Sequence, residues 1–247
     1  MTKRIALVTG GMGGIGTAVC KRLAEAGHAV AANCLPGYPK KDEWLAQMRR
    51  EGYADVHAAE GDVADFASAG AMVRRIEAEL GPVDILVNNA GIIRDSVMKK
   101  MSPEDWLAVI NTNLNSAWYV TKHVIEGMSE RGWGRVVNMS SVNGQKGQFG
   151  QTNYSAAKAG LHGFAKALAQ EVIRKGVTVN SVSPGYVETD MVKAIRPDVL
   201  DKLVASIPIG RLAKPAEIAA LVGFLASDEA GYITGANIAI NGGMYMV

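Results

Sequence analysis

The amino-acid sequence predicts a single doubly wound α/β domain, in which helices flank a seven-stranded parallel sheet. Three observations lead to this fold class. Short apolar runs alternate with helical patterns over residues 1–247, without a repeat or a linker. The first apolar run leads into a glycine cluster that opens a helix. Polar turn residues follow several other runs, as expected where parallel strands end at one rim of a sheet.

The strands and helices are expected from the order of these patterns. Short apolar runs predict strands, at residues 4–9, 29–34, 54–59, 83–87, 135–139, 177–182 and 237–240. Amphipathic segments predict the helices between them, at residues 17–26, 42–51, 66–80, 102 onward, 154–175 and 215–226. Residues 186–207 have a mixed pattern, and we expect them to form an insert that covers the site.

The helix that begins near Ser102 contains an unusual cluster of amides. Ser102 is followed by Pro103 and two acidic residues, a sequence that is typical of a helix N-terminus. Farther along, Asn111, Asn113 and Asn115 lie within the predicted helix, although asparagine lowers helix propensity. We therefore expect a local reason for these three residues.

Composition excludes several classes of function. The chain has 247 residues and a formal net charge of +2, unlike the concentrated basic face of proteins that bind nucleic acid. Cys20 and Cys34 have neither a disulfide nor a metal-ligand spacing, so we expect reduced thiols, no metal and a cytoplasmic location. The apolar stretches are shorter than the ~20 residues of a membrane span, and the first is too short for a signal peptide.

The glycine cluster after the first strand predicts a dinucleotide site. Gly10, Gly14 and Gly16 follow the spacing Gly-x-x-x-Gly-x-Gly between a strand and a helix. Glycines let the backbone approach a pyrophosphate, and the helix N-terminus supplies free N–H groups and positive potential. A tight structural turn is the alternative, but the position after the first strand favours the cofactor.

The segment after the second strand favours NADPH. An enzyme that prefers NAD usually places an acid there to hold the ribose 2′-hydroxyl. In this chain the first acid is Asp42, and Lys40 and Lys41 precede it. These lysines would attract a 2′-phosphate, although they could equally be a solvated pair at the start of the next helix.

Tyr154 and Lys158 predict acid–base chemistry. Four residues apart on a helix, they would share one face. A nearby ammonium favours the phenolate, lowers the pKa of the phenol, and so suits the tyrosine to proton transfer. Ser141 could place its hydroxyl beside the same oxygen, across a glycine-rich loop. Taken alone, this short pattern could equally be an exposed tyrosine and a solvated lysine.

Together, these motifs resemble those of the short-chain dehydrogenase/reductase family, over essentially the whole chain. The resemblance rests on Thr9-Gly-x-x-x-Gly14-x-Gly16, Asn88-Asn89-Ala90-Gly91, Asn113, Ser141, Tyr154-x-x-x-Lys158, Pro184-Gly185 and Thr189. It implies that Tyr154 donates a proton and that Ser141 orients the substrate carbonyl. It also implies that Lys158 holds the nicotinamide ribose, and that Asn113 binds a water that links Lys158 to a proton relay.

The same resemblance implies a Rossmann-type site for NADPH. Asp62 and Val63 would contact the adenine, and Thr189 the carboxamide. The expected cofactor-binding residues are Gly10, Met12, Gly13, Gly14, Ile15, Gly16, Lys40, Gly61, Asp62, Val63, Asn89, Ala90, Gly91, Tyr154, Lys158, Pro184, Gly185, Val187 and Thr189.

Within the family, residues 11–14, 131–135 and 142–154 resemble the acetoacetyl-CoA reductases of polyhydroxybutyrate synthesis. Relatives that act on acyl carrier protein usually carry a basic residue at the position of Gly13. The glycine favours the CoA branch, but it removes a usual NADPH contact and leaves Lys40 or Lys41 to replace it. A 3-oxoacyl-[acyl-carrier-protein] reductase is the nearest alternative. A non-catalytic nucleotide sensor would lack the tyrosine.

The expected substrate is a short 3-oxoacyl thioester of CoA. Phe149 would limit the acyl pocket, and the neighbouring glutamines would donate to the substrate oxygens. The expected substrate-binding residues are Asp95, Lys100, Ser141, Gln148, Phe149, Gln151, Tyr154, Gly185 and Tyr186. The family resemblance also implies a homotetramer, which the apolar C-terminal residues 244–247 support.

Overall fold

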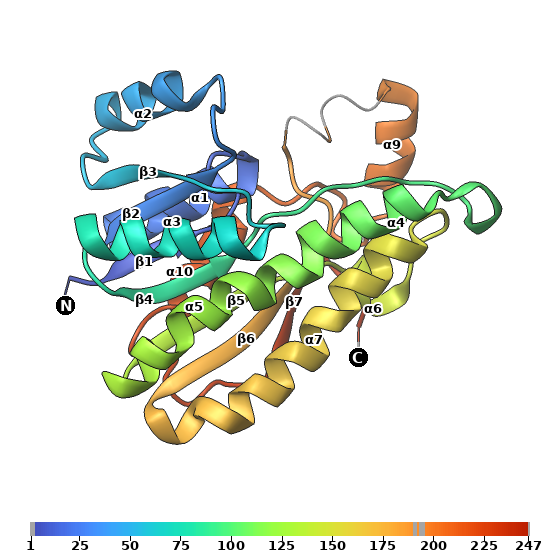
Figure 1. Ribbon diagram of the computed structural model, residues 1–247. Coiled ribbons are helices and arrows are strands. Elements are labelled where there is room, and N and C mark those ends of the chain that lie inside the picture. The colour runs from blue at the N-terminus through green and yellow to red at the C-terminus, as the bar shows by residue number, and fades with distance from the viewer. Residues whose placement is uncertain (1–2, 190–191, 193–195, 247) are drawn as a thin grey trace.

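The computed structural model of the protein describes residues 3–189, 192 and 196–246 (Figure 1). Seven parallel strands form one sheet in the order β3-β2-β1-β4-β5-β6-β7, which confirms the predicted fold class. The strands are β1 (Ile5–Val8), β2 (Ala29–Cys34), β3 (Val56–Glu60), β4 (Val83–Asn88), β5 (Gly134–Met139), β6 (Val177–Pro184) and β7 (Asn237–Ile240). Because all seven belong to one sheet, we propose that the chain is one domain.

Helices cover both faces of the sheet, and Figure 1 shows α3, α5 and α7 across one of them. The α-helices are α1 (Gly14–Glu25), α2 (Lys41–Arg50), α3 (Phe66–Glu79), α4 (Pro103–Ile110), α5 (Ser116–Glu130), α6 (Asn143–Lys146), α7 (Thr152–Val172), α9 (Pro197–Ala205) and α10 (Pro215–Leu225). Short 3₁₀ segments occur at η1 (Met98–Lys100) and η3 (Ile173–Lys175). None of the helices in the described residues is both long and apolar enough to cross a membrane.

Two apolar layers hold the helices on the sheet. In β1, Ala6 and Val8 face the layer that contains α1, α2 and α10, whereas Leu7 faces the layer of α3, α5 and α7. Successive strand residues point to opposite faces, so a strand that is buried on both sides must be apolar at every position. This explains the continuous apolar runs in the sequence.

The helix predicted from Ser102 is interrupted where the asparagines lie. α4 and α5 are joined by a π-helical turn, η2 (Asn111–Asn115), which contains all three of them. The buried Asn113 side chain pairs with the backbone of Ile92: Oδ1 accepts from the Ile92 N–H at 2.8 Å, and Nδ2 donates to the Ile92 carbonyl at 3.0 Å. Such π-turns often mark functional sites. The expected local reason is therefore a break in the helix that ties it to the turn after β4.

The segment predicted to cover the site begins after β6. Residues 190–191 and 193–195 of this segment lie outside the described residues. Of the rest, α9 takes up residues 197–205, and Figure 1 shows it beyond the sheet, away from the layer of α3, α5 and α7. That this segment covers bound substrate stays a prediction.

Candidate active site

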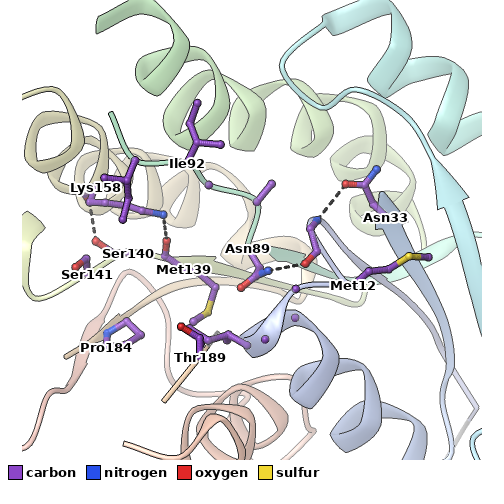
Figure 2. Close-up of a pocket in the computed structure, with 18 of the residues that line it drawn as sticks. Met12, Asn33, Asn89, Ile92, Met139, Ser140, Ser141, Lys158, Pro184 and Thr189 are labelled. Atoms are coloured by element: carbon purple, nitrogen blue, oxygen red, sulfur yellow. Dashed lines mark hydrogen bonds between the residues drawn. The ribbon is translucent and has the colours of Figure 1, made fainter. Parts of the chain in front are cut away.

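A cleft of about 580 Å³ opens at the carboxyl ends of the central strands (Figure 2). Its walls come from the turns after β1 and β4, the ends of β2, β5 and β6, and the start of α7. The structure brings together in it most of the predicted cofactor and catalytic residues: Gly10, Met12, Gly13, Gly14, Ile15, Gly16, Asn89, Ala90, Gly91, Ser141, Tyr154, Lys158, Pro184, Gly185 and Thr189.

The glycine turn leaves its backbone open to a ligand. Gly10 has a φ of 60°, which strains any residue with a side chain. A Cβ added to Gly16 would lie 2.3 Å from the Gly10 carbonyl oxygen, so the turn could not close there with another residue. At the N-cap of α1, Gly13 supplies no side-chain cap to the first-turn N–H groups. These groups therefore fit the phosphates of a dinucleotide.

Thr9 and Asn89 lock the glycine turn to the turn after β4. Thr9 Oγ1 accepts from the Asn89 N–H at 2.9 Å and from the Ala90 N–H at 3.0 Å. In return, Asn89 Nδ2 donates to the Thr9 and Gly10 carbonyls at 3.0 and 3.1 Å. Figure 2 shows the bond to Gly10 in the floor of the cleft. The amide-rich turn is thus a structural support for the glycine turn.

Asn33 is a site residue that the sequence analysis missed. Its Oδ1 accepts from the Gly10 N–H at 3.1 Å, and its Nδ2 donates to the Gly61 carbonyl at 2.9 Å. The signal was present, because a polar residue in an otherwise apolar strand needs buried partners. Other lining residues that were not predicted are Cys34, Leu35, Tyr38, Ile92, Ile93, Met139 and Ser140.

Tyr154 lies in the cleft with its phenol largely buried. Burial raises the pKa of Tyr154, a hydrogen bond with Ser141 lowers it, and the charges of Asp95 and Tyr186 raise it. The net direction is upward, so the expectation that Lys158 lowers the pKa of this phenol is wrong for this geometry. Lys158 Nζ lies 5.6 Å from the Tyr154 ring centroid. A raised pKa keeps the phenol protonated at neutral pH, which is the form that a proton donor needs.

Lys158 is held from two sides at the floor of the cleft (Figure 2). Its Nζ donates to the Met139 carbonyl oxygen at 2.6 Å, and its own carbonyl accepts from the Ser140 hydroxyl at 2.8 Å. Burial lowers the pKa of the ammonium to about 8. A Cβ added to Gly91 would lie 3.5 Å from both Lys158 Nζ and Asn113 Oδ1, so these groups are close neighbours.

Five of the predicted cofactor residues lie outside the lining of the cleft: Lys40, Gly61, Asp62, Val63 and Val187. The two valines are buried in the apolar layers. Asp62 Oδ1 accepts from the Ala64 N–H at 2.9 Å, so its carboxylate closes its own turn. Contacts of these residues with a cofactor stay a prediction.

Several predicted substrate residues also lie outside the lining: Asp95, Lys100, Gln148, Phe149, Gln151 and Tyr186. Phe149 is 87% exposed, and Gln148 accepts from Lys146 Nζ at the surface. In one chain, therefore, Phe149 does not close an acyl pocket. Gln151 is buried and bonded to other protein groups, which the sequence pattern did not indicate.

The sequence was also compared with known proteins. A family model described as short chain dehydrogenase matches residues 4–200. The chain belongs to the short-chain dehydrogenase family. It is therefore an oxidoreductase with a Rossmann-type fold that uses a nicotinamide cofactor.

Individual relatives match nearly the full length of this chain. Acetoacetyl-CoA reductase of Cupriavidus necator is 61% identical over 246 residues, which is 100% of both chains. Nodulation protein G of Azospirillum brasilense is 58% identical over 244 residues, which is 99% of each chain. A 3-oxoacyl-[acyl-carrier-protein] reductase of Pseudomonas aeruginosa is 45% identical over 98% of both chains.

Proposed function

We propose that the protein reduces acetoacetyl-CoA to (R)-3-hydroxybutyryl-CoA with NADPH, in polyhydroxybutyrate synthesis. The observation that carries this proposal is a half-buried tyrosine, hydrogen-bonded to Ser141, that lines the same cleft as the glycine turn. Relatives named acetoacetyl-CoA reductase, at 49–61% identity over the full length, support the substrate. The buried, unpaired thiols of Cys20 and Cys34 support a cytoplasmic location.

The proton in this reaction comes from Tyr154. The cofactor, when bound beside the glycine turn, would supply the hydride that the carbonyl carbon of the 3-oxo group accepts. Ser141 and Tyr154 hold the carbonyl oxygen between their hydroxyls and stabilise the negative charge that develops on it. The Tyr154 O–H then gives its proton to that oxygen, so that the ketone becomes a secondary alcohol. Hydride and proton together account for the two electrons and two hydrogens added.

Lys158 serves both the cofactor and the proton supply in this scheme. Its ammonium would hold the nicotinamide ribose and would be the proton reserve from which Tyr154 is reprotonated. The Asn113 side chain is bonded to Ile92 and fixes the π-helical turn, and we propose that a backbone carbonyl of this turn binds the relay water. Interrupted i→i−4 bonding in such a turn makes backbone carbonyls available.

The substrate assignment predicts a specific pattern of turnover. We expect NADPH oxidation with acetoacetyl-CoA, slower turnover with the same acyl group on acyl carrier protein, and a fall beyond about five or six acyl carbons. Added methylenes that do not fit beside the acyl group lower kcat/KM. This expectation rests on the relatives named for acetoacetyl-CoA, since Phe149 is exposed and closes no pocket within one chain. Initial rates for a series of thioesters measure this. Faster turnover of the carrier-protein thioesters, or a flat chain-length profile, would instead indicate a 3-oxoacyl-[acyl-carrier-protein] reductase.

The two lysines after β2 have different contacts in the structure, so the cofactor prediction can be narrowed to one of them. Lys41 Nζ donates to Glu60 Oε1 at 2.6 Å, whereas Lys40 is exposed. We therefore propose that Lys40 binds the 2′-phosphate of NADPH. Lys40→Ala should raise KM for NADPH several-fold without changing kcat or KM for NADH, because a contact far from the hydride contributes uniform binding.

The matched control for Lys40→Ala is a double variant in which Lys41 and Glu60 are both replaced by alanine. This change leaves the local net charge unaltered and should shift the NADPH-to-NADH ratio of kcat/KM less than Lys40→Ala does. A larger shift with the control, or equal kcat/KM for the two cofactors in the wild type, would contradict the assignment of Lys40.

We also propose that the protein is a homotetramer. On α5 and α7, Val124, Met128 and Leu161 belong to the core. In contrast, Trp118 is 49% exposed and stacks on Phe66, itself 42% exposed, with 5.7 Å between ring centroids. Exposed aromatic pairs are typical of surfaces that another chain covers. Light scattering at micromolar concentration should give four times the 26.1 kDa chain mass, and a monomer mass would contradict the proposal.

A further inference from the structure

Three polar side chains connect the loop after β4 to the loop after β5. Gln151 Nε2 donates to Asp95 Oδ2 at 2.9 Å, and Asn143 Nδ2 donates to Gln151 Oε1 at 2.9 Å. Gln151 is 8% exposed and Asn143 is 6% exposed. Both ends of the Gln151 amide are thus bonded to protein groups, so this side chain is not presented to a substrate as the sequence suggested.

The direction of each hydrogen bond follows from Asp95. An ionised carboxylate only accepts, so Gln151 must turn its NH₂ group toward Asp95. The Gln151 oxygen then faces Asn143, and Asn143 must present its own NH₂ group to it. The two amides are therefore fixed in one orientation, although they contain donors and acceptors of similar shape.

The same connection continues to Ser141. The backbone N–H of Asn143 donates to Ser141 Oγ at 3.1 Å. This bond uses a lone pair of the hydroxyl and leaves its proton available for donation. Ser141 can give that proton to Tyr154, whose pKa a hydrogen bond with Ser141 lowers, and both residues line the cleft.

We infer that Asn143 and Gln151 are positioning residues, which hold the Ser141 hydroxyl as a hydrogen-bond donor toward the Tyr154 oxygen and the substrate carbonyl. This inference rests on the proposed roles of Ser141 and Tyr154. Asp95 anchors the connection at its outer end, 56 residues away from Gln151 in the chain. Neither amide contacts the reacting atoms, and both act through Ser141.

A double-mutant cycle between Gln151 and Ser141 tests this inference. Gln151→Leu keeps a similar volume but removes both hydrogen bonds, and should lower kcat for acetoacetyl-CoA by about tenfold or more. In a Ser141→Ala background, the same Gln151→Leu change should lower kcat by less than about twofold, because its target is already absent. The Kd for NADPH should stay near the value of each parent, and the Tm should fall by a similar amount in both backgrounds, because the same two buried hydrogen bonds are lost.

Two outcomes of the cycle would overturn the inference. Equal effects of Gln151→Leu in the two backgrounds would mean that Gln151 contacts the substrate itself, and an unchanged kcat in the wild-type background would mean that it only packs. Gln170→Leu, the same change at an exposed position of α7, controls for loss of a glutamine from this helix. Asn143→Ala should give the pattern of Gln151→Leu, and a normal kcat for it would also overturn the inference.

A second measurement does not depend on the substrate. The Tyr154 phenol can be titrated by NMR in protein labelled with ¹³C at the tyrosine Cζ, and Tyr154→Phe identifies its signal. Because the Ser141 bond lowers the pKa of Tyr154, Gln151→Leu should raise this pKa, as Ser141→Ala should, with no further rise in the double variant. Asp95, Tyr186 and Lys158, the other ionisable groups near the phenol, are present in all three variants. Asp95 loses its Gln151 donor in Gln151→Leu, and any effect of that loss on the phenol would appear as a further rise in the double variant.

The NMR result separates failure of the inference from failure of the proposed function. A wild type that is inactive with acetoacetyl-CoA refutes the function alone, while the titration still tests the positioning role. Additive changes in the pKa of Tyr154, or none with Gln151→Leu, refute the positioning role even if the enzyme reduces acetoacetyl-CoA.

Discussion

Tyr154→Phe should lower kcat for acetoacetyl-CoA by about 10²–10⁴-fold, the usual contribution of a general acid, and leave the Kd for NADPH near the wild-type value. The substitution removes only the phenol oxygen, which is the proton source, and keeps the ring that fills the cleft. Stopped-flow or steady-state kinetics measure kcat, and the quenching of protein fluorescence measures the Kd. Retention of more than about a tenth of kcat, a loss of less than ~1.4 kcal/mol, would rule out Tyr154 as the proton donor.

Tyr53→Phe is the matched control for this experiment. It removes the same oxygen from a tyrosine that bonds Glu25 Oε1 at 2.8 Å, outside the residues that line the cleft. Its kcat should equal that of the wild type. A comparable loss in both variants would show that the effect of Tyr154→Phe is not specific to the cleft.

Lys158→Met should remove most of the activity and at the same time raise the Tm of the cofactor-free protein at pH 7. Turnover falls because the ammonium that serves the ribose and the proton relay is lost. Stability rises because burial lowers the pKa of Lys158 from 10.5 to about 8, so the folded state carries a charged group that it disfavours. A difference of this size corresponds to roughly 3 kcal/mol, offset by about 1 kcal/mol for the lost bond to Met139.

The stability difference between the wild type and Lys158→Met should change with pH, and the lowered pKa of Lys158 fixes the direction of that change. Below about pH 8 both the folded and the unfolded wild type keep the Lys158 proton, and the unfavourable burial is fully present. Between about pH 8 and 10.5 the unfolded chain binds the proton and the folded chain does not, so wild-type stability rises relative to Lys158→Met. Thermal unfolding of the two proteins from pH 7 to 10 should show the gap in Tm narrowing. A gap that is constant, or a less stable variant at pH 7, would contradict a buried ammonium.

Local patterns predicted the elements and the central part of the site. The apolar runs are continuous because the sheet is covered on both faces, and Gly16 is needed where a Cβ would meet the Gly10 carbonyl. Tyr154 and Lys158 share a helix, so their spacing alone places them together. These features depend on residues that are close in the chain.

Contacts between distant loops could not be predicted in this way. Gln151 was expected to bind substrate, but its partner Asp95 lies in another loop, and only the packed sheet brings the two together. Lys41 and Lys40 look equivalent in the sequence, yet Glu60 on the adjacent strand pairs with Lys41. Likewise, burial has the largest effect on the pKa of Tyr154, and the spacing of charged residues in the sequence gives no information about burial.

The π-helical turn η2 determines how α4 and α5 are rotated relative to each other about the helix axis. Each α-helical residue advances the helix by about 100°, and a π-turn accommodates one additional residue. The wider turn takes up the additional residue, so α4 and α5 keep nearly the phase that one continuous α-helix would have. A chain shorter by one residue in Asn111–Asn115 could therefore form a regular helix with Val109 still buried, but the turn that brings Asn113 to Ile92 would be lost. The additional residue thus serves the site rather than the packing of the two helices.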